Sequence, residues 1–355
     1  MKKMVQMTAE LIKKLSEEAQ EKAEKKSMPD WLDPMLAKLT HDHFTGDDWI
    51  FERKLDGERV LAYVSDEGDV TLYSRNQKNL NDSYPEIQEA LAEHAEPGCI
   101  LDGEVVAFDE KDISDFQKLQ PRMHASSREE SLESDVAVYY YLFDMLYVNG
   151  HDIAGCSLRD RKKLLREAVK SEDPLRLVKY RNDDGIEFYK EACQKGWEGL
   201  IAKHEGSSYV HSRSSKWLKF KCIKQQEFVI GGYTEPHGER IGFGALLLGF
   251  YKDGELVYAG KVGTGFDDQT LKEMREKLEK IESDTSPYDR GEPETKEVHF
   301  VSPKLVCEVA FSEWTEDDRL RHPRYKGLRR DKSPEDVHKE EQSQAAELDK
   351  ENDGS

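Results

Sequence analysis

Hydrophobic and polar positions recur with different periods in different parts of the chain, and each period predicts a type of element. Residues 1–26 repeat apolar side chains at roughly helical spacing within a Lys/Glu-rich background, and Pro29 follows shortly after. The repeating positions are Met4, Met7, Leu11 and Leu15. This spacing predicts one amphipathic helix over residues 1–26.

From Trp31 the pattern becomes that of short strands bounded by turn residues. The predicted strands in this part of the chain are 49–51, 60–64, 70–74, 100–108 and 136–146, and residues 84–95 predict a helix. The last two strands are so rich in apolar side chains that both of their faces are expected to be covered.

A second change of pattern occurs near Cys222. Beyond it, strand patterns follow one another closely at 228–233, 245–251, 256–262 and 298–311, with a helix pattern at 267–282. Asp253-Gly254 is a hairpin turn sequence between two of these strands. Short strands with one helix over about 100 residues predict a small closed barrel.

With 355 residues, the chain is long enough for two hydrophobic cores. The fold class that we predict is α+β, in which a domain of antiparallel sheets and flanking helices precedes a β-barrel. We expect four segments: a helical extension at 1–28, the larger domain at 29–222, the barrel at 223–332 and an acidic tail at 333–355.

The composition, 37% hydrophobic and 35% charged, is typical of a folded, water-exposed protein rather than a disordered one. The longest apolar run, near residues 245–251, is far shorter than a membrane span. The N-terminal residues lack the apolar core of a signal peptide. A cytoplasmic protein without a membrane partner is therefore expected.

The five cysteines lie far apart and form no Cys-x-x-Cys pair. Their odd number and their spacing fit neither a disulfide framework nor a zinc site, so they are expected to be reduced core thiols. The net charge of −20 argues against a nucleic-acid partner, but it is spread unevenly. Residues 333–355 alone hold eight acidic residues against two lysines, so a nucleic-acid surface would have to be a local basic patch.

The segment 52–59, Glu-Arg-Lys-Leu-Asp-Gly-Glu-Arg, contains the pattern Lys-x-Asp-Gly-x-Arg. A lysine becomes a nucleophile only when its ammonium can lose a proton near pH 7, and burial and neighbouring cations lower its pKa. Lys54 follows an apolar strand and lies close in sequence to Arg53 and Arg59, so both conditions are expected. The alternative is that Asp-Gly is only a turn and that Lys54 is a solvated strand residue.

Five further motifs follow in order, and together with the lysine motif they resemble the covalent nucleotidyltransferase superfamily of ATP-dependent DNA ligases, RNA ligases and capping enzymes. The motifs are Ser74-Arg75-Asn76, Leu101-Asp102-Gly103-Glu104, Tyr141-Leu142-Phe143-Asp144, Glu198-Gly199-Leu200-Ile201-Ala202-Lys203 and Trp217-Leu218-Lys219-Phe220-Lys221. The resemblance extends from about Trp31 to Asp336 and implies an OB-type fold for the barrel.

The resemblance implies that Lys54 receives AMP from ATP and that Asp56 and Arg59 complete its motif. Glu52 matches the position that reads the adenine edge, Phe143 the position that stacks on the ring, and Arg75 the position that contacts the nucleotide or the DNA end phosphate. Arg53 and Lys203 lie in the same motifs and are included in the implied nucleotide site. On pattern alone, Phe143 would instead be a core residue.

Two further pairs complete the implied site. Glu104 and Glu198 match positions near the ribose hydroxyls and a divalent metal, for which Mg²⁺ is expected and Mn²⁺ is the alternative. Lys219 and Lys221 alternate with apolar residues on a strand, so their amines share one face and could neutralise an α-phosphate. Without the resemblance, these residues could be surface carboxylates and a solvated strand face.

The segment 319–332 is dense in cations and, taken alone, could be a basic solvated loop. In the family, the matching Arg329, Asp331 and Lys332 close over the β- and γ-phosphates of ATP from the barrel domain. A mobile domain that carries these cations would serve the first chemical step and leave for the later ones. The planar guanidinium of arginine suits phosphate recognition.

Within the superfamily, the chain resembles most closely the ligase module of the bacterial and archaeal end-joining DNA ligases, the DNA ligase D type. The segments that carry this resemblance are 116–122, 231–234, 242–249, 261–266 and 321–324. Unlike the full-length members, which carry polymerase and nuclease modules, the chain is expected to be a stand-alone ligase whose partners are separate polypeptides. NAD-dependent ligases fit poorly, because they carry a four-cysteine zinc site.

The implied reaction is the ATP-dependent sealing of 3′-hydroxyl/5′-phosphate nicks through lysyl-AMP and a DNA-adenylate. The expected partners are nicked or broken duplex DNA, a Ku-like end-binding protein and a separate repair polymerase. The protein is expected to be a monomer and to be associated with the nucleoid. The alternatives are an RNA ligase or capping-type enzyme, and an OB-type nucleic-acid-binding protein with a degenerate nucleotide site.

Overall fold

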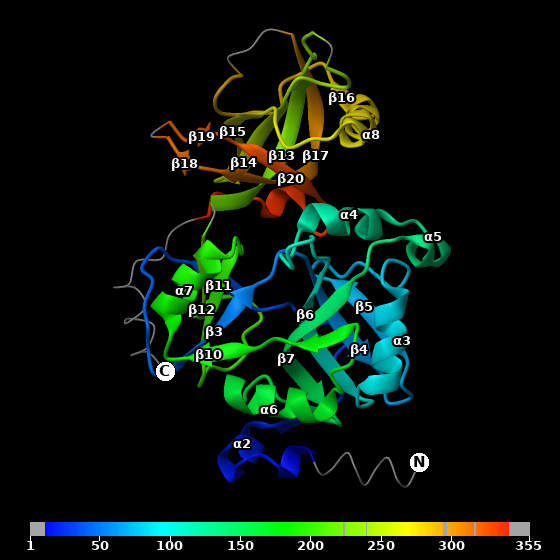
Figure 1. Cartoon of the computed structure of the whole chain (residues 1–355), viewed down its shortest axis with the longest axis vertical. Coiled ribbons are helices and arrows are strands. Elements are labelled where there is room, and N and C mark those ends of the chain that lie inside the picture. Colours follow the sequence, from blue (N-terminus) through cyan, green and yellow to red (C-terminus); the bar gives the residue numbers. More distant parts are fainter. Residues whose placement is uncertain (1–10, 223, 239, 294–296, 316, 341–355) are drawn as a thin grey trace. The chain divides into compact units, whose positions relative to one another are not determined.

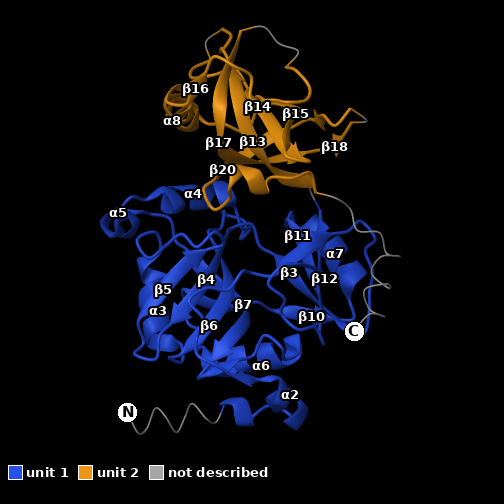
Figure 2. Ribbon diagram, turned by 180° about the vertical axis from the view of Figure 1, so that it is seen from behind, with its two compact units in different colours: residues 1–222, 342–355 blue, residues 223–341 orange. Residues whose placement is uncertain are grey.

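The computed structural model describes residues 11–222, 224–238, 240–293, 297–315 and 317–340. The chain divides into two compact units, of which unit 1 reaches Cys222 and unit 2 spans Ile223–Glu341 (Figure 2). The division falls where the strand pattern of the sequence changes. Within the described residues, no helix combines the length and the apolar character needed to cross a membrane.

The larger sheet of unit 1 has the order β1-β8-β7-β6-β4-β5, and β9 pairs in parallel with β7 (Figure 1). Its strands are β1 (Glu24–Lys25), β4 (Glu58–Val64), β5 (Val70–Ser74), β6 (Cys99–Val106), β7 (Tyr139–Val148), β8 (His151–Asp152) and β9 (Leu175–Leu177). Almost every residue of β6 and β7 is buried, which confirms that both faces of these strands are covered.

The smaller sheet of unit 1 has the order β10-β3-β11-β12-β2. Its strands are β2 (Leu36–Leu39), β3 (Trp49–Lys54), β10 (Tyr180–Asn182), β11 (Gly199–His204) and β12 (Arg213–Lys221). One face of this sheet is apolar and packs against α7 (Gly185–Gln194) through residues such as Phe51, Leu200, Phe220 and Phe188. The opposite face is therefore available for polar groups.

A third apolar cluster joins the two sheets of unit 1. It combines Leu61 and Ile100 of the larger sheet with Trp217 of the smaller one, and it includes Phe143 and Tyr209. The alternation of side chains on β4 explains the division, because Val60 and Ala62 belong to the separate main core on the other face. The face of the larger sheet that carries Leu61 and the face of the smaller sheet that carries Trp217 therefore both border this third cluster.

The remaining helices of unit 1 are α2 (Glu17–Lys22), α3 (Pro85–His94), α4 (Phe116–His124), α5 (Arg128–Glu133) and α6 (Leu158–Ala168). Helix α6 packs against β7. It begins after Ser157, whose hydroxyl accepts a hydrogen bond from the backbone N–H of Asp160. Its buried apolar residues, Leu158, Leu164, Leu165 and Ala168, fix which face turns to the sheet.

The described residues of unit 2 form a main antiparallel sheet, a two-stranded sheet and one α-helix. Its elements are β13 (Lys224–Thr234), β14 (Leu246–Lys252), β15 (Glu255–Val262), α8 (Asp268–Glu279), β16 (Glu282–Ser283), β17 (Val298–Phe311), β18 (Glu313–Trp314), β19 (Leu320–Arg321), β20 (Arg324–Arg329) and the 3₁₀ turn η1 (Pro334–Asp336). The main sheet has the order β15-β14-β13-β17-β16, and β20 pairs with β17. The predicted α+β class is confirmed. Among the described residues, no strand pairing links β15 to β16 or β20, so the hydrogen-bonded strands of the main sheet do not close into a ring.

The Asp253-Gly254 hairpin is confirmed, since both residues adopt the left-handed backbone that a two-residue turn requires. The predicted helix over residues 1–26 lies partly outside the described residues, and within them it is interrupted. Ser16 caps a new helix, α2, and Lys25 then pairs as a strand with His151. Residues 333–340, expected in the acidic tail, belong to unit 2, where the backbone N–H of Tyr251 donates to the carbonyl of Val337.

The prediction that all five cysteines are reduced is wrong for two of them. Cys193, near the end of α7, forms a disulfide with Cys222, at the end of unit 1. The two are 29 positions apart in sequence, and the packing of α7 on the smaller sheet brings them together. Cys99, Cys156 and Cys307 are buried free thiols, as expected.

The buried ion pair between Asp144 and Arg161 generates a prediction about stability. Both side chains are fully buried, and the guanidinium donates two hydrogen bonds to the carboxylate, at 2.7 and 2.9 Å. Asp144→Asn would leave the Arg161 charge buried without its counter-ion. We expect the variant to lower the free energy of unfolding of unit 1 by about 3–5 kcal/mol.

Urea denaturation followed by tryptophan fluorescence measures this loss, because four of the five tryptophans lie in unit 1. Glu18→Gln is the control, since its pair with Lys22 is exposed to solvent, and this variant should unfold like the wild type. An Asp144→Asn protein as stable as the wild type would contradict the prediction.

Candidate active site

The register of three neighbouring strands gathers charged side chains on one face of the smaller sheet. In the β3–β11 pair, Glu52 lies opposite Ile201 and Lys54 opposite Gly199. In the β11–β12 pair, the same two β11 residues face Lys219 and Lys221. Since directly paired residues point to the same side, Glu52, Lys54, Lys203, Lys219 and Lys221 share the face opposite the α7 core.

Two glycines permit this close arrangement of strands and loops. A side chain at Gly199 would place its Cβ 1.9 Å from the carbonyl oxygen of Phe220, and the φ of Gly199 is +148°. A side chain at Gly57 would place its Cβ 2.2 Å from the carbonyl oxygen of Val105. Both positions therefore require glycine. Beside Gly57, the backbone N–H of Asp56 donates to the hydroxyl of Ser114 at 3.0 Å.

Lys54 forms an ion pair with Glu198, which lies directly before β11. Burial by itself favours the neutral amine, but attraction to Glu198, Asp56 and Glu104 outweighs it and raises the pKa of Lys54. The expected lowering of this pKa is therefore wrong for the structure as it stands. The pKa of Lys54 is raised because the carboxylate of Glu198, 144 positions away in sequence, lies beside the amine.

Arg53, expected to assist Lys54 and to bind the nucleotide, lies on the other face of β3. Its guanidinium stacks over the ring of Trp197 at 4.4 Å and near Phe108 at 5.6 Å. It also donates to the carbonyl oxygen of Asp112 at 3.2 Å. Because side chains alternate along a strand, Arg53 cannot join the face that carries Lys54.

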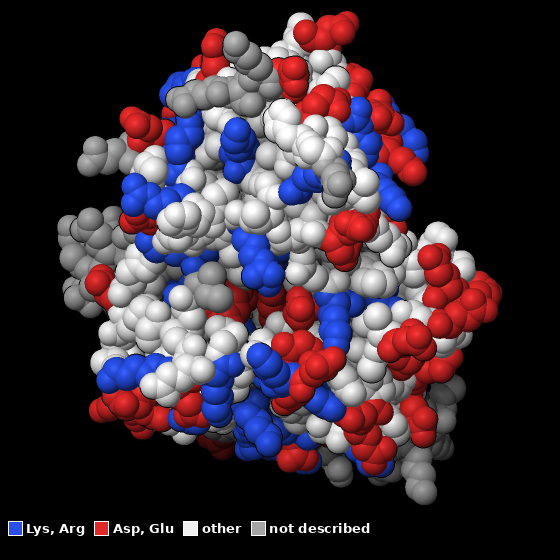
Figure 3. Space-filling model, turned by 45° about the horizontal axis from the view of Figure 1, so that its top comes forward, with Lys and Arg blue, Asp and Glu red and all other residues white. Residues whose placement is uncertain are grey.

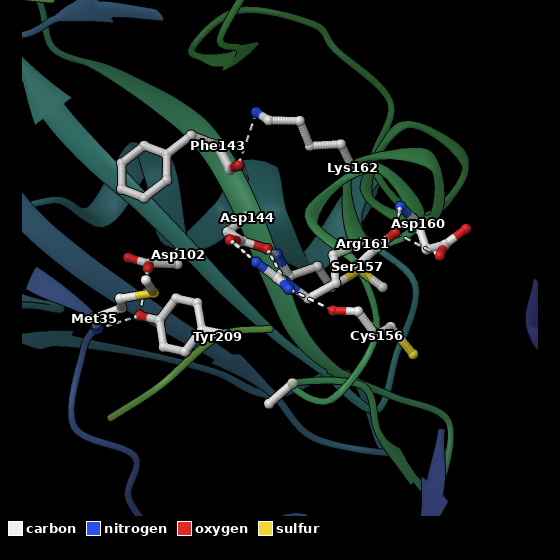
Figure 4. A network of polar contacts seen from close by, with 12 residues as sticks. Met35, Asp102, Phe143, Asp144, Cys156, Ser157, Asp160, Arg161, Lys162 and Tyr209 are labelled. Atoms are coloured by element: carbon white, nitrogen blue, oxygen red, sulfur yellow. Dashed lines mark hydrogen bonds and ion pairs between the residues drawn. The ribbon is translucent and has the colours of Figure 1, made fainter. Parts of the chain in front are cut away.

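The larger sheet contributes Arg59 and Glu104, which are directly paired in the β4–β6 ladder. The guanidinium of Arg59 donates two hydrogen bonds of 2.5 Å to Asp102. The hydroxyl of Tyr209, which lies beside Asp102 in Figure 4, donates to the same carboxylate at 2.7 Å. Arg59 also lies over the ring of Phe143, 4.6 Å from its centroid. Asp102 thus fixes Arg59 beside the apolar cluster between the sheets.

Phe143 is buried and has, besides Arg59, an aromatic and a second cationic neighbour. Trp217 meets it edge to face, with ring centroids 6.1 Å apart. The ammonium of Lys203 lies 4.1 Å from the centroid of Phe143 and 3.9 Å from that of Trp217. Burial, followed by repulsion from Lys162, lowers the pKa of Lys203 to about 8.

Glu52 is a buried carboxylate held between two buried lysines. The ammonium of Lys203 lies 2.7 Å from Oε2, and the ammonium of Lys162, on α6, forms an ion pair with Oε1. Lys162 also donates to the backbone carbonyl of Phe143 at 3.0 Å (Figure 4). The site therefore links Glu52 and Phe143 through one side chain.

Glu104 and Glu198 both lie close enough to Lys54 to raise its pKa. Two carboxylates fit a magnesium ion, which usually keeps several waters and takes few protein ligands beside substrate phosphates. The described residues contain no group of three or more His, Cys, Asp or Glu side chains that could hold a metal by themselves. The donor set thus fits a metal that arrives with a phosphate.

The remaining predicted residues belong to other elements than β3, β11 and β12. Arg75 is half-buried in the turn that follows β5. In unit 2, Arg329 at the end of β20 binds Glu308 and Asp331, at 2.9 and 2.7 Å, and Lys332 lies 3.0 Å from Glu227. The two cations of this motif are thus held by acidic partners of their own unit.

Figure 3 shows that lysine and arginine side chains form several local groups on the face in view, interspersed with acidic side chains. The chain as a whole carries a net charge of −20. Basic surface is therefore present in patches despite the acidic total.

Sequence reasoning missed four residues of this site: Asp102, Lys162, Tyr209 and Trp217. Trp217 and Asp102 lie within the motifs 217–221 and 101–104, but the motifs alone predicted no role for these two residues. Lys162 lies on α6, and two features of the sequence indicate this helix, namely the capping residue Ser157 and the helical spacing of its apolar residues. Nothing in the sequence indicated that Tyr209 would reach Asp102 across 107 positions.

The ion pair between Lys54 and Glu198 generates a prediction about amine reactivity. Glu198→Gln removes the nearest charge that stabilises the Lys54 ammonium, so the pKa of Lys54 should fall in the variant. Each unit of pKa is tenfold in the neutral fraction, and we expect Lys54 to be methylated at least about tenfold faster at pH 8.5.

Mass spectrometry after timed reductive methylation measures the rate at each lysine. Lys25, exposed on β1, is the internal standard and should react equally in both proteins. Equal rates at Lys54 would show that Glu198 does not control its protonation.

Two family models match the chain. The model described as ATP dependent DNA ligase domain matches residues 34–221, and the model described as ATP dependent DNA ligase C terminal region matches residues 239–332. The two matches fall in unit 1 and unit 2, respectively. Since the first match alone covers more than half of the chain, it is sufficient to assign the family.

Named relatives agree with this assignment. The multifunctional non-homologous end joining protein LigD of Pseudomonas aeruginosa is 39% identical over 320 residues, which are 88% of this chain and 37% of that protein. The DNA ligase of Thermococcus fumicolans is 34% identical over 310 residues, which are 82% of this chain and 54% of that protein. The chain thus spans only about a third to a half of the length of these relatives.

Among solved structures, mycobacterial DNA ligase D complexed with ATP and MES is similar in fold and sequence. It has 35% sequence identity and a TM-score of 0.63, and the match covers 87% of this chain and 98% of that one. The resemblance predicted from the motifs is thereby confirmed, and the chain belongs to the family of ATP-dependent DNA ligases, close to the ligase domain of LigD.

Proposed function

We propose that the chain seals nicks in duplex DNA with ATP, through a covalent AMP on Lys54. The observation that supports the proposal is the charged face of β3, β11 and β12. This face presents the amine of Lys54, which is paired with Glu198, on the same side as Lys219 and Lys221. In the first step, the Nζ of Lys54 attacks the α-phosphorus of ATP. The P–N bond forms as the bond to pyrophosphate breaks, and the amine loses its proton.

The raised pKa of Lys54 sets a condition for this step. The amine must be released from Glu198 before it can attack. The negative triphosphate, drawn by Lys219 and Lys221, would compete for the ammonium, and a divalent cation would compete for the carboxylate. The ion pair thus keeps Lys54 inactive until the nucleotide and the cation arrive.

The nucleotide would lie along this face. Glu52 would accept a hydrogen bond from the 6-amino group of adenine, and Phe143 would stack on the ring. Arg59, fixed by Asp102, and Arg75 are proposed to bind the ribose or phosphate groups. Lys219 and Lys221 would neutralise the charge that builds up on the α-phosphate. Arg53 is left out of this set because it lies on the opposite face of β3.

Glu104 and Glu198 are proposed to hold Mg²⁺, or Mn²⁺ in its place, together with phosphate oxygens. The metal would withdraw electrons from the phosphate and neutralise its charge. Arg329 and Lys332 are proposed to bind the β- and γ-phosphates when unit 2 engages the nucleotide. Their acidic partners Glu308, Asp331 and Glu227 would be exchanged for phosphate.

In the later steps AMP passes from Lys54 to the 5′-phosphate of the nick, and the P–N bond breaks as a pyrophosphate bond forms. The 3′-hydroxyl then attacks that 5′-phosphate and AMP leaves. Splitting one displacement into three lowers each barrier. We propose end joining as the pathway, with a Ku-like protein and a separate polymerase as partners, since relatives that match 88% of this chain are named for end joining.

Labelling with α-labelled ATP and Mg²⁺ tests the first step. Wild-type protein should keep the label on a denaturing gel, and nicked DNA should remove it. Lys54→Ala should lose the label because the variant lacks the proposed nucleophile. Lys25→Ala, an exposed lysine on β1, is the matched control and should label normally.

Label that persists in Lys54→Ala would refute the nucleophile. Label from GTP instead of ATP would indicate a capping-type enzyme, and sealing of RNA nicks instead of DNA nicks would indicate an RNA ligase. The intact mass of the protein is measured before labelling, with and without pyrophosphate treatment. A mass that pyrophosphate lowers by one AMP would show that the protein was already adenylated.

The salt dependence of nick sealing tests the DNA contact. A protein that neutralises several phosphates releases counter-ions, so its affinity falls linearly with the logarithm of salt concentration. We expect sealing at subsaturating DNA to fall at least about tenfold between 50 and 200 mM NaCl. Formation of lysyl-AMP in the same buffers is the control and should change much less, and equal losses in both reactions would contradict a phosphate-dominated interface.

A further inference from the structure

We propose that Lys162, on α6, is a positioning residue that makes the nucleotide site select adenine. It does so by fixing the Glu52 carboxylate relative to the ring of Phe143. The inference rests on the proposed function, in which Glu52 and Phe143 bind the base.

The first argument is burial. Lys162 and Glu52 are 3% and 2% exposed, respectively, and their side chains form an ion pair. A lysine is almost never this deeply buried unless a charged partner holds it, and the pair carries a large desolvation cost. Because Glu52 is proposed to face the base, we infer that its ion pair with Lys162 orients the Glu52 carboxylate.

The second argument is the double attachment of Lys162. Its ammonium also donates to the backbone carbonyl of Phe143 at 3.0 Å, so one side chain touches both proposed base contacts. Figure 4 shows Lys162 reaching this carbonyl from α6, next to the fully buried pair of Arg161 and Asp144. The helix that carries Lys162 is therefore anchored on β7, the strand of Phe143.

The third argument is the contrast with Lys203, the other partner of Glu52. Lys203 lies over the rings of Phe143 and Trp217, at 4.1 and 3.9 Å, where a stacked base would compete with its ammonium. Lys162 instead contacts Phe143 from its backbone side. Lys162 can thus hold Glu52 while a purine occupies the ring, and Lys203 is the partner that the purine would disturb.

The chemistry of the base explains why this position gives selectivity. An ionised carboxylate only accepts hydrogen bonds, so it can bind the 6-amino group of adenine. Hypoxanthine and guanine carry an oxygen at the same position, which the carboxylate would repel. A site built around such a hydrogen bond rejects analogues that lack the donor, provided that the acceptor is held in place.

The experiment compares lysyl-nucleotide formation from ATP and from ITP, in which a 6-oxo group and an N1–H replace the 6-amino group and the unprotonated N1 of ATP. We expect Lys162→Met to lower the ratio of kcat/KM for ATP to that for ITP by about tenfold to a hundredfold, the effect of misplacing a contact by about 1 Å. The ratio comes from one protein preparation, so partial unfolding of the variant cancels.

Two further variants act as controls. Lys163→Met alters the neighbouring lysine, which is exposed and contacts the backbone of Lys14, and it should keep the wild-type ratio. Lys162→Arg keeps the charge and should restore part of the selectivity, and it serves as the test if Lys162→Met does not fold. In a Glu52→Gln background, Lys162→Met should produce no further change in the ratio, because Lys162 acts through Glu52.

The outcomes separate the alternatives. Equal losses with ATP and ITP in Lys162→Met, with an unchanged ratio, would overturn the proposal and leave Lys162 a purely structural residue. An additive effect in the Glu52→Gln background would also overturn it. Wild-type protein that labels with neither nucleotide would refute the proposed function itself, which is a different result from an unchanged ratio.

Discussion

The alternation of side chains across β3, β11 and β12 is the constraint on which the site depends. One face of these strands must be apolar because α7 packs on it through Phe51, Leu200 and Phe220. Every residue in register with Lys54 on the other face is then presented to the same side. A shift of one position would bury the amines against α7 and expose the phenylalanines, so the core enforces the arrangement of the charged groups.

Buried charges in unit 1 are organised as compensated sets rather than as isolated groups. Arg161 with Asp144, Arg59 with Asp102, and Glu52 with its two lysines each balance desolvation by direct ion pairs. Such pairs contribute little net stability, yet losing one partner is costly. They also hold planar groups at fixed angles, which is what recognition of a flat base and a tetrahedral phosphate requires.

Much of the fold and the site could be predicted from the sequence, because both depend on local order. Strand alternation predicted that Lys219 and Lys221 share a face, and the Asp253-Gly254 turn followed from local chemistry. The failures involve residues that are distant in sequence. The sequence predicted that Arg53 and Arg59 would set the pKa of Lys54, whereas its ion-pair partner is Glu198 and Arg53 lies on the other face of β3. The Cys193–Cys222 bond and the contacts of Lys162 with Glu52 and Phe143 likewise depend on helices packing against sheets.

The acidic partners of Arg329 and Lys332 have a consequence for the energetics of ATP binding. Both cations are already neutralised by carboxylates within unit 2, and Arg329 is nearly buried there. Contact with a triphosphate is therefore an anion exchange, in which one set of charge-assisted hydrogen bonds replaces another. The net free energy is the difference between two similar terms. An exchange of this kind is readily reversible, which suits a group that must release its ligand in every catalytic cycle.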